Sequence, residues 1–455
     1  MARKLIKFSH KMWRILLIIV FAASARAELR LSTFDVDVTP PVGSMMAYDR
    51  VTNHWDMSLR ARGIVLMGAG QPIVLCSVDW IGIANGGHDA FCESLAKAAG
   101  TVPERVSVHT IHQHDAPDCD FSAEAILKKE GLETGQFEGG YQRQALADVA
   151  AAISESLKFS QPITHVGMGS AVVEKVASNR RVMGADGKVK AVRYTACPDP
   201  KLRAEPEGTI DPVVSLISFW NAEKPIAVLS FYATHPQSYY RTGIPNPDFP
   251  GLARFMRQLE VPSALHVHFN GAGGNIGAGK YNDGAQTNRL ILAQRLADGM
   301  RRAWADTKKE AIEPERVNWK SERVFIPAAA HLKQEELVEE MRKNATFVTR
   351  GAASRLAWVQ RCAEGRKVQV SCLEFGKARA FFLPGESFVE YQLAAKAQRS
   401  DLFVAMAAYG DYGPWYIGTS KAYDEGGYET SPGATNVGPE AEPVVRAAIS
   451  RLLQN

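Results

Sequence analysis

The stretch from Val106 to Asp120, VSVHTIHQHDAPDCD, determines how the rest of the chain is interpreted. Its β-branched first half predicts a short strand over residues 105–111 that ends in a polar turn. His112 and His114 stand at this turn, and because side chains alternate faces in an extended chain, we expect both imidazoles to point the same way. The arrangement suits one metal ligand beside an acid–base group, or two metal ligands. The same spacing also occurs in polar loops whose histidines bond only to the backbone.

The first 27 residues have the composition of a secretory signal peptide. Five Lys or Arg residues precede or enter an apolar run that extends from Ile15 to Ala25, and Ala25-Arg26-Ala27 fits a cleavage site. The apolar run is too short for a stable membrane span. We therefore expect residues 1–27 to be removed and residues 28–455 to form one continuous domain. The protein would be exported, periplasmic or secreted, with no transmembrane anchor after cleavage.

Removal of this segment changes the charge of the chain. Six of the 53 basic residues and none of the 49 acidic residues lie in residues 1–27, so the formal net charge of the remainder is −2 rather than +4. A hydrophobic fraction of 46% and a charged fraction of 22% are typical of a globular protein. Nothing in this balance indicates a nucleic-acid partner, which requires a basic face.

Six cysteines are present, and none of them forms a C-x-x-C pair. The sequence therefore indicates neither a thiolate zinc knuckle nor a thioredoxin-type site. Export would permit disulfides, and Cys362 and Cys372 are close enough in sequence to bridge a loop. Spacing does not determine the pairing, and small buried hydrophobic roles fit the cysteines equally well.

Strand-like and helix-like patterns alternate along the chain. Paired apolar runs predict strands with hairpin turns over 62–78 and 213–233, and further strands are expected at 166–177, 264–269, 369–383 and 402–408. Apolar stripes at helical spacing predict helices over 89–99, 141–157, 288–305, 335–345 and 442–453, with a loop over 125–140. No internal repeat is visible. The pattern is typical of an α/β fold with mixed β-sheets flanked by helices.

Polar residues recur where the predicted strands end. His112 and His114 follow one strand, His235 follows another, and Glu386 follows a Pro-Gly turn after a third. Because sites in sheet-based enzymes form beyond strand ends, we expect these side chains to converge. Imidazoles and a carboxylate from separate strands are the donors of a catalytic zinc site. The residues therefore indicate metal-assisted hydrolysis, although a strand-end histidine or a turn carboxylate also has an ordinary structural role available.

At these residues the chain resembles the neutral ceramidase family, over residues 30–440. Five short motifs carry the resemblance, in the same order: His112-Gln113-His114-Asp115-Ala116-Pro117, Asn179-Arg180, Ala233-Thr234-His235, Pro384-Gly385-Glu386, and Tyr416 with Tyr428 twelve residues on.

The resemblance implies a zinc ion held by four side chains: His112, His235, Glu386 and Tyr416. It also implies that three others surround the substrate carbonyl: His114, Arg180 and Tyr428. His114 would then transfer a proton, and Arg180 and Tyr428 would donate to an oxyanion. Tyrosine is an unusual zinc ligand, and Tyr409 and Tyr412 are rivals for Tyr416.

The sequence departs from the family in two places. Gly277 stands where the family has a serine that contacts substrate, and the chain stops without the family's additional C-terminal β-rich domain. Both departures argue against ceramide itself while leaving the metal donors intact. The same glycine-rich loop nearly matches a P-loop through Lys280, but Tyr281 replaces the required Ser or Thr, so we expect no ATP site. There is no G-x-S-x-G motif of a serine hydrolase.

The sequence therefore predicts an exported zinc-dependent hydrolase that cleaves an amide (N-acyl) bond by attack of metal-bound water on the carbonyl. The substrate would be a small or lipid-like N-acyl compound, such as an N-acyl sphingoid lipid or an acylated sugar. A carbohydrate-directed or ester-cleaving enzyme with the same pocket and a non-catalytic binding protein are the alternatives. We expect His109, His266 and His268 to be structural.

Overall fold

The computed structural model describes residues 28–343 and 347–454. The predicted signal peptide, residues 1–27, lies outside the described residues. Among the helices of the described part, none is both long and apolar enough to cross a membrane.

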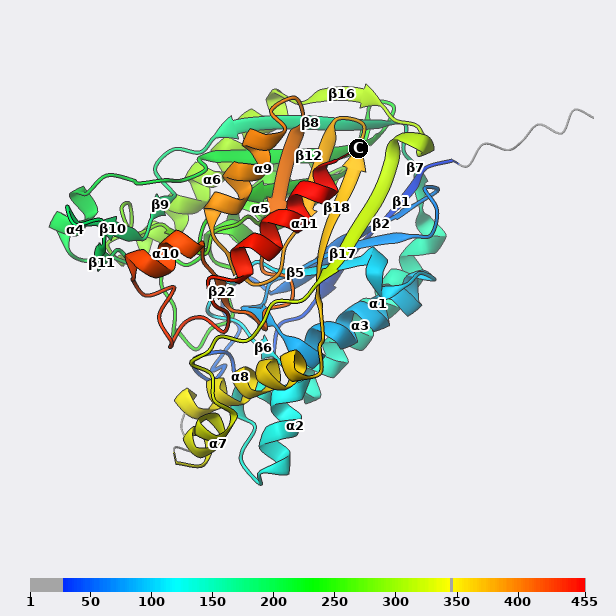
Figure 1. The fold of residues 1–455 in the computed structure, drawn as a ribbon. Coiled ribbons are helices and arrows are strands. Elements are labelled where there is room, and N and C mark those ends of the chain that lie inside the picture. Colours follow the sequence, from blue (N-terminus) through cyan, green and yellow to red (C-terminus); the bar gives the residue numbers. More distant parts are fainter. Residues whose placement is uncertain (1–27, 344–346, 455) are drawn as a thin grey trace, which may run out of the picture.

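Three β-sheets form the body of the molecule (Figure 1). The first has the strand order β5-β3-β2-β1-β7, the second β14-β13-β12-β8-β16 and the third β17-β18-β19-β21. The strands of the first sheet are β1 (Arg30–Asp37), β2 (Arg60–Met67), β3 (Ile73–Val78), β5 (Val106–Thr110) and β7 (Gln161–Pro162). Those of the second are β8 (His165–Val172), β12 (Val213–Asn221), β13 (Lys224–Tyr232), β14 (Leu265–Asn270) and β16 (Lys308–Ala311). Those of the third are β17 (Val317–Val324), β18 (Val368–Phe375), β19 (Ala378–Phe382) and β21 (Phe403–Ala407).

The three sheets repeat one topology. In each sheet, three strands pair antiparallel in chain order, and a fourth strand joins the third in parallel. A helix connects each parallel pair: α1 (Asn85–Ala99), α5 (Asp248–Glu260) and α9 (Val389–Gln398). A second helix follows each fourth strand and packs back on the unit: α3 (Gly140–Ser156), α6 (Thr287–Ala305) and α11 (Ala441–Leu453). This repeat of the topology is not visible as a repeat in the sequence.

Each sheet is buried on both faces. One face of every sheet contributes to a shared central core that contains Leu31, Ile217 and Leu373. The other face is covered by helices, α1 and α3 on the first sheet, α5 and α6 on the second, and α9 and α11 on the third. Strands buried on both sides read as continuous apolar runs, and all six residues of β3 are buried. The predicted fold class, mixed sheets flanked by helices, is confirmed.

The segments that connect or follow the strands of the three sheets, called linking segments below, contain helices that the sequence patterns did not predict. The predicted loop over 125–140 is wrong in its first part, because α2 (Phe121–Lys129) extends to Lys129. The side chain of Asp120, the residue before this helix, caps the backbone N–H groups of Ser122 and Ala123 at 3.0 Å each. The pattern also missed α5, whose first turn contains Pro250 and Gly251. The strand expected to reach residue 177 ends earlier, as β8.

Further elements lie between or after the strands of the three sheets: β4 (Gly82–Ile83), β6 (Asp118–Cys119), η2 (Gly135–Phe137), β9 (Ser178–Asn179), β10 (Arg181–Met183), β11 (Val189–Val192), α4 (Pro200–Ala204), β15 (Ile276–Gly277), α7 (Gln334–Lys343), α8 (Phe347–Ala363), β20 (Glu386–Ser387), β22 (Tyr416–Ile417) and α10 (Ser420–Glu425). Helices α2, α7 and α8 lie together at the lower end of the view in Figure 1.

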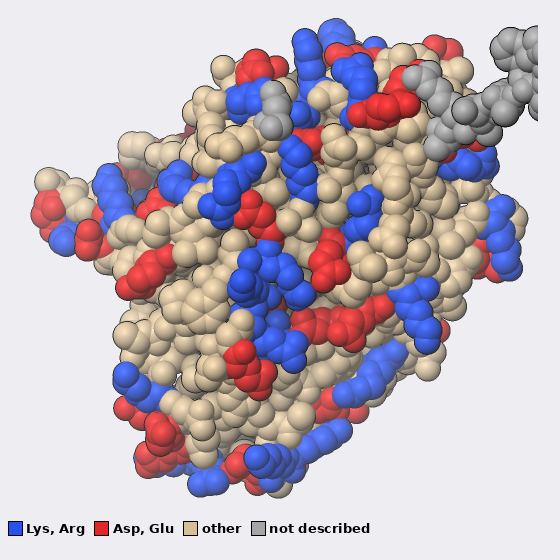
Figure 2. Space-filling model, turned by 45° about the vertical axis from the view of Figure 1, so that its right-hand side comes forward, with Lys and Arg blue, Asp and Glu red and all other residues tan. Residues whose placement is uncertain are grey.

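The surface charges are mixed in sign, and no disulfide links the elements of the described structure. On the face in Figure 2, basic and acidic side chains are interspersed, and a central basic group is bordered by acidic residues. All six cysteines, which lie within the described part of the chain, are free thiols, so Cys362 and Cys372 do not form a bridge. Four of the six are buried, as expected for small hydrophobic residues.

Candidate active site

Three strand exits, one from each sheet, meet at a single point. His112 follows β5, His235 follows β13 and Glu386 follows β19. Their donor atoms all lie within 4.8 Å of one another. Glu386 Oε2 is 2.8 Å from His235 Nε2 and 3.4 Å from His112 Nε2. The predicted convergence of these residues is confirmed, and each side chain is at most 2% exposed.

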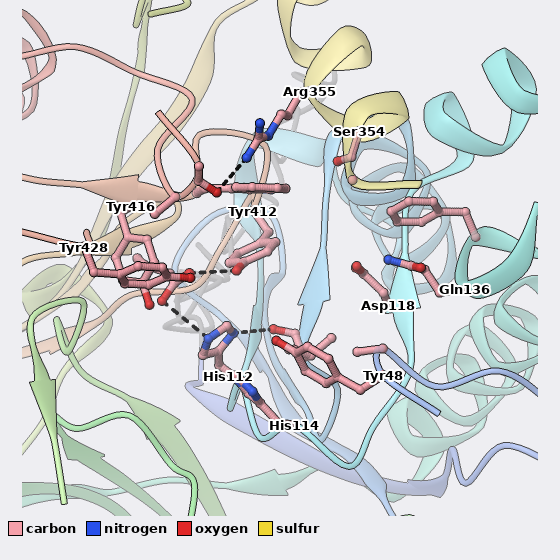
Figure 3. Close-up of a pocket in the computed structure, with 18 of the residues that line it drawn as sticks. Tyr48, His112, His114, Asp118, Gln136, Ser354, Arg355, Tyr412, Tyr416 and Tyr428 are labelled. Atoms are coloured by element: carbon pink, nitrogen blue, oxygen red, sulfur yellow. Dashed lines mark hydrogen bonds and ion pairs between the residues drawn. The ribbon is translucent and has the colours of Figure 1, made fainter. Parts of the chain in front are cut away.

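A group that follows the neighbouring parallel strand holds each of these side chains in place; the contacts of His112 and Tyr412 can be followed in Figure 3. His112 Nδ1 contacts the carbonyl oxygen of Ile81, after β3, at 2.7 Å. His235 Nδ1 contacts the carbonyl oxygen of Gly273, after β14, at 2.8 Å. The Tyr412 hydroxyl, after β21, donates to Glu386 Oε1 at 2.7 Å. Ligand and orienting group therefore follow the two strands of one parallel pair in every sheet.

This arrangement points electron pairs at a common position. A neutral imidazole that donates through Nδ1 presents a lone pair at Nε2, so both histidines offer acceptors. Glu386 Oε2 is also an acceptor, and no hydrogen-bond donor of the described residues reaches it. Converging acceptors that are buried and oriented by outer partners are the donor set of a divalent cation such as zinc. The residues present therefore fit a metal ion.

Tyr416 is placed beside this donor set. Its strand, β22, pairs in parallel with β20, so that Tyr416 lies opposite Glu386. Tyr416 Oη is 3.0 Å from His235 Nε2. Of the two rivals, Tyr409 stacks on the His112 ring with centroids 4.7 Å apart, and Tyr412 is the partner of Glu386. Tyr416 as a metal ligand stays a prediction.

Arg180 lies behind the donor set and does not line the pocket described below. Its Nη1 is 3.0 Å from Tyr416 Oη and 3.1 Å from His235 Nε2, and its Nε is 3.4 Å from Glu429 Oε1. Burial alone would lower the pKa of Arg180, but Tyr416 and Glu429 raise it above the ordinary value. Burial and the Arg180 charge lower the pKa of His235. The arginine thus keeps this imidazole neutral, and its predicted contact with a substrate carbonyl stays a prediction.

His114 lines the pocket between two aromatic rings. It stacks on Tyr48 with centroids 5.2 Å apart and meets Tyr240 edge-on at 4.9 Å. The amide nitrogen of Gln237 contacts His114 Nε2, whereas His114 Nδ1 has no hydrogen-bond partner among the described residues. Burial lowers the pKa of His114 well below its ordinary value, and the nearness of the His112 and His235 imidazoles adds to this effect. A neutral ring with a free Nδ1–H is available to a substrate.

The local backbone differs from the expected extended chain. The strand ends at Thr110, and His112 has a left-handed φ of 65°. His112 and His114 both line the pocket described below, but strand alternation is not what places them there; their rings meet edge-to-face at 5.1 Å. Left-handed backbone in a residue with a side chain is strained and is typical of functional sites.

Asp115 ties a second loop to this turn, a role that sequence reasoning missed. It accepts hydrogen bonds from the backbone N–H of Arg241 at 2.8 Å and from the Thr242 hydroxyl at 2.8 Å. This holds the segment that carries Gln237 and Tyr240 against His114. Its position directly after the H-x-H pair was the available signal.

A pocket of about 570 Å³ opens beside the donor set (Figure 3). His112, Glu386 and Tyr416 reach into it, and Tyr428, 39% exposed, lies at its edge with its ring 5.9 Å from that of Tyr416. The linking segments supply the rest of the lining, which includes Tyr48, Asp118, Gln136, Ser354, Arg355 and Trp415. No sequence motif marks these residues as part of a site, because they come from four segments outside the three sheets that are unrelated in sequence.

Other singled-out residues have structural roles. His109, His266 and His268 are buried, as expected. Lys280 of the near P-loop donates to the carbonyl oxygens of Arg203 and Glu205 at 3.0 and 2.5 Å. A Cβ on Gly277, the position of the missing serine, would lie 3.3 Å from Arg180 Cγ.

No protein-family model matches the chain, and no curated protein sequence matches it. Solved structures do match. A ceramidase in complex with C2 superposes with a TM-score of 0.68 at 15% identity, covering 93% of this chain and 74% of that chain. The neutral ceramidase from Pseudomonas aeruginosa superposes with a TM-score of 0.67 at 17% identity, covering 94% of this chain and 76% of that chain. At such identities the likeness shows a ceramidase-like fold.

Proposed function

We propose that the protein is a zinc-dependent hydrolase that cleaves the amide bond of an N-acyl substrate. The observation that carries this proposal is the convergence of His112, His235 and Glu386, buried and oriented from three separate sheets, at one side of a pocket. The ceramidase-like fold supports the amide as the scissile group.

The proposed metal ligands are His112, His235, Glu386 and Tyr416. Zinc in this position would supply a Lewis acid for the carbonyl and a water of lowered pKa. The Nδ1 contacts of both histidines and the Tyr412 hydroxyl fix the donor atoms before the ion binds, which reduces the free energy cost of organising the site.

The remaining roles belong to side chains around the donor set. His114, neutral and facing the pocket, would accept the proton given up by the attacking water and then pass it to the leaving amine. The Tyr428 hydroxyl would donate to the oxygen of the substrate carbonyl as charge develops on it. Arg180 would stabilise the same charge through the Tyr416 hydroxyl, to which it donates, because its guanidinium does not itself line the pocket.

The test is a screen of N-acyl and O-acyl substrates with the zinc-loaded protein. We expect hydrolysis of amides that is abolished by a chelator and restored by zinc. His165→Ala, which removes a half-buried imidazole of β8 away from the pocket, should leave turnover unchanged. Zinc binding without turnover on any amide or ester would instead favour a non-catalytic binding protein.

We also propose that the protein is exported, from the basic and apolar segment before Glu28. Expression of the full chain in a bacterial host should yield a mature form that begins at residue 28 outside the cytoplasm. A cytoplasmic product that keeps its first 27 residues would contradict export.

A further inference from the structure

The wall of the pocket that lies away from Tyr416 and Tyr428 is polar (Figure 3). Asp118 of β6 and Gln136 of η2 both line it, and the packing of β6 against η2 brings them to the same wall. Ser354 of α8 completes this wall. Gln136 is 6% exposed and Ser354 is 3% exposed. Because buried polar groups in proteins are almost always hydrogen-bonded, those that face a pocket without a partner are available to a bound molecule.

Two acceptors of this wall lack side-chain partners in the described structure. Gln136 Oε1 is buried and has no hydrogen-bond partner there. Asp118 Oδ1 accepts a hydrogen bond from the backbone N–H of Cys119 at 2.9 Å, and no side chain in the described part of the chain donates to the carboxyl group. The Ser354 hydroxyl is already used, since it donates to Asp120 Oδ2 at 2.8 Å. The unmet hydrogen-bonding capacity therefore belongs to Asp118 and Gln136.

Hydroxyl groups match this pair better than other substituents. Burial and the neighbouring Asp120 raise the pKa of Asp118 to about 7, so near neutral pH its carboxyl group can both accept and donate. A hydroxyl group can do the same, whereas an ammonium group only donates. An alkyl chain against this wall would leave the buried Gln136 Oε1 unpaired and would remove water from the half-buried Asp118 carboxyl group, which is costly. Phe137 and Trp415 add apolar surface for the carbon skeleton of a ring or short chain.

We propose that Asp118 and Gln136 form a subsite for adjacent hydroxyl groups, so that the preferred substrate is a compact, hydroxyl-rich amide of the acylated amino-sugar or sugar-acid type. Plain alkyl amides would be disfavoured. Hydrolysis of such a substrate rests on the proposed function, but its binding at the subsite does not.

The experiment compares matched substrates with the zinc-loaded full chain. N-acetylglucosamine is set against N-cyclohexylacetamide, and N-butylgluconamide against N-butylhexanamide, so that hydroxyl groups are tested on either side of the amide. We expect kcat/KM to favour the hydroxyl-bearing member of at least one pair by about 10-fold or more. Gln136→Leu and Asp118→Ala should remove most of this preference by lowering kcat/KM for the hydroxyl-bearing member alone.

Gln392→Leu is the matched control. Gln392 is an equally buried amide, 4% exposed, which donates to Asp211 Oδ2 at 2.6 Å outside the pocket. This variant should keep the wild-type preference. Zinc content and circular dichroism report whether each variant folds, and Asp118→Asn replaces Asp118→Ala if the latter does not.

The outcomes separate the subsite from the chemistry. Equal kcat/KM within both pairs for the wild type, or equal losses on both members in the variants, overturns the subsite. If the wild type cleaves no amide, the proposed hydrolysis fails, and calorimetric binding of glucosamine and N-butylgluconamide decides the subsite. Binding at least about 10-fold tighter to the wild type than to Gln136→Leu supports it, and equal or absent binding of both probes overturns it.

Discussion

The second and third sheets place different residues at the same topological position. His235 follows β13 and is oriented by a main-chain carbonyl after β14, whereas Glu386 follows β19 and is oriented by the Tyr412 hydroxyl after β21. An imidazole N–H needs only an acceptor, and the backbone supplies one at every residue. A carboxylate needs a donor, and here the Tyr412 hydroxyl supplies it. The same topology can therefore position either a histidine or a glutamate as a candidate metal ligand, with a different orienting group in each case.

The two exits also differ in charge. Burial and Arg180 lower the pKa of His235, so this ring is neutral at neutral pH. Burial would raise the pKa of Glu386, but His112 and His235 hold it well below the ordinary value. The third sheet therefore supplies the negative charge among the three converging side chains, and the predictions below test this division.

The largest effect is expected when that charge is removed. Glu386→Gln keeps the shape of the side chain but replaces an anionic donor by a neutral amide. We expect turnover to fall by at least about 100-fold and zinc to be lost, because the metal depends on the carboxylate charge. The variant should stay folded, since its amide can donate to His235 Nε2. Steady-state rates and zinc content are the measurements, and near-normal activity would contradict the assignment.

Removal of the orienting hydroxyl should have a smaller effect. Tyr412→Phe leaves all the proposed ligands in place but frees Glu386 Oε1. Loss of such an outer partner typically costs 10- to 100-fold in metal affinity or activity, and we expect a value of about that size. Competition with a chromogenic chelator measures the zinc affinity. Tyr423→Phe, which deletes a hydroxyl that donates to the Val437 carbonyl oxygen at 2.8 Å outside the pocket, is the control; an equal loss in both variants would argue against orientation.

The pH dependence of the free energy of unfolding distinguishes the buried histidines from Glu386. Burial lowers the pKa values of His109, His266 and His268 to about 3, and it also lowers those of His114 and His235. Unfolded histidines take up protons below about pH 6.5, but these folded ones do not. The free energy of unfolding of the metal-free protein should therefore fall as the pH drops from about 6.5 to about 5, by at most about 1.4 kcal/mol per pH unit for each histidine. Glu386, with its pKa held low, contributes nothing in this window.

Urea unfolding of the chelator-treated protein at about pH 7.5, 6 and 5 measures this slope, through midpoints read with a common m-value. His266→Gln should reduce the slope by roughly the share of one histidine. Asp115, Asp118 and Asp120, whose pKa values burial raises to about 6, 7 and 6, act in the opposite sense, so the comparison with the variant decides. An equal slope in the wild type and His266→Gln would show that the His266 imidazole becomes protonated in the folded state.

The sequence predicted the polar residues at the strand ends but not the sheet topology that brings them together. Continuous apolar runs located most strands, and the polar residues that follow them identified His112, His235 and Glu386. The threefold topology was invisible, because a buried sheet requires only apolar residues and tolerates any order of them. Asp118 and Gln136 were likewise not assigned to the site, since the fold alone brings β6 and η2 together. The caps of α2 and the left-handed backbone of His112 depend on local contacts that periodicity does not report.

Zinc stoichiometry, measured by elemental analysis after dialysis of the full chain against zinc and then against buffer, tests the three-sheet site most directly. The account predicts about one tightly bound ion per chain in the wild type, and loss of that ion in each of His112→Ala, His235→Ala and Glu386→Gln. A wild type that retains no zinc, or single variants that retain it as fully as the wild type does, would contradict it.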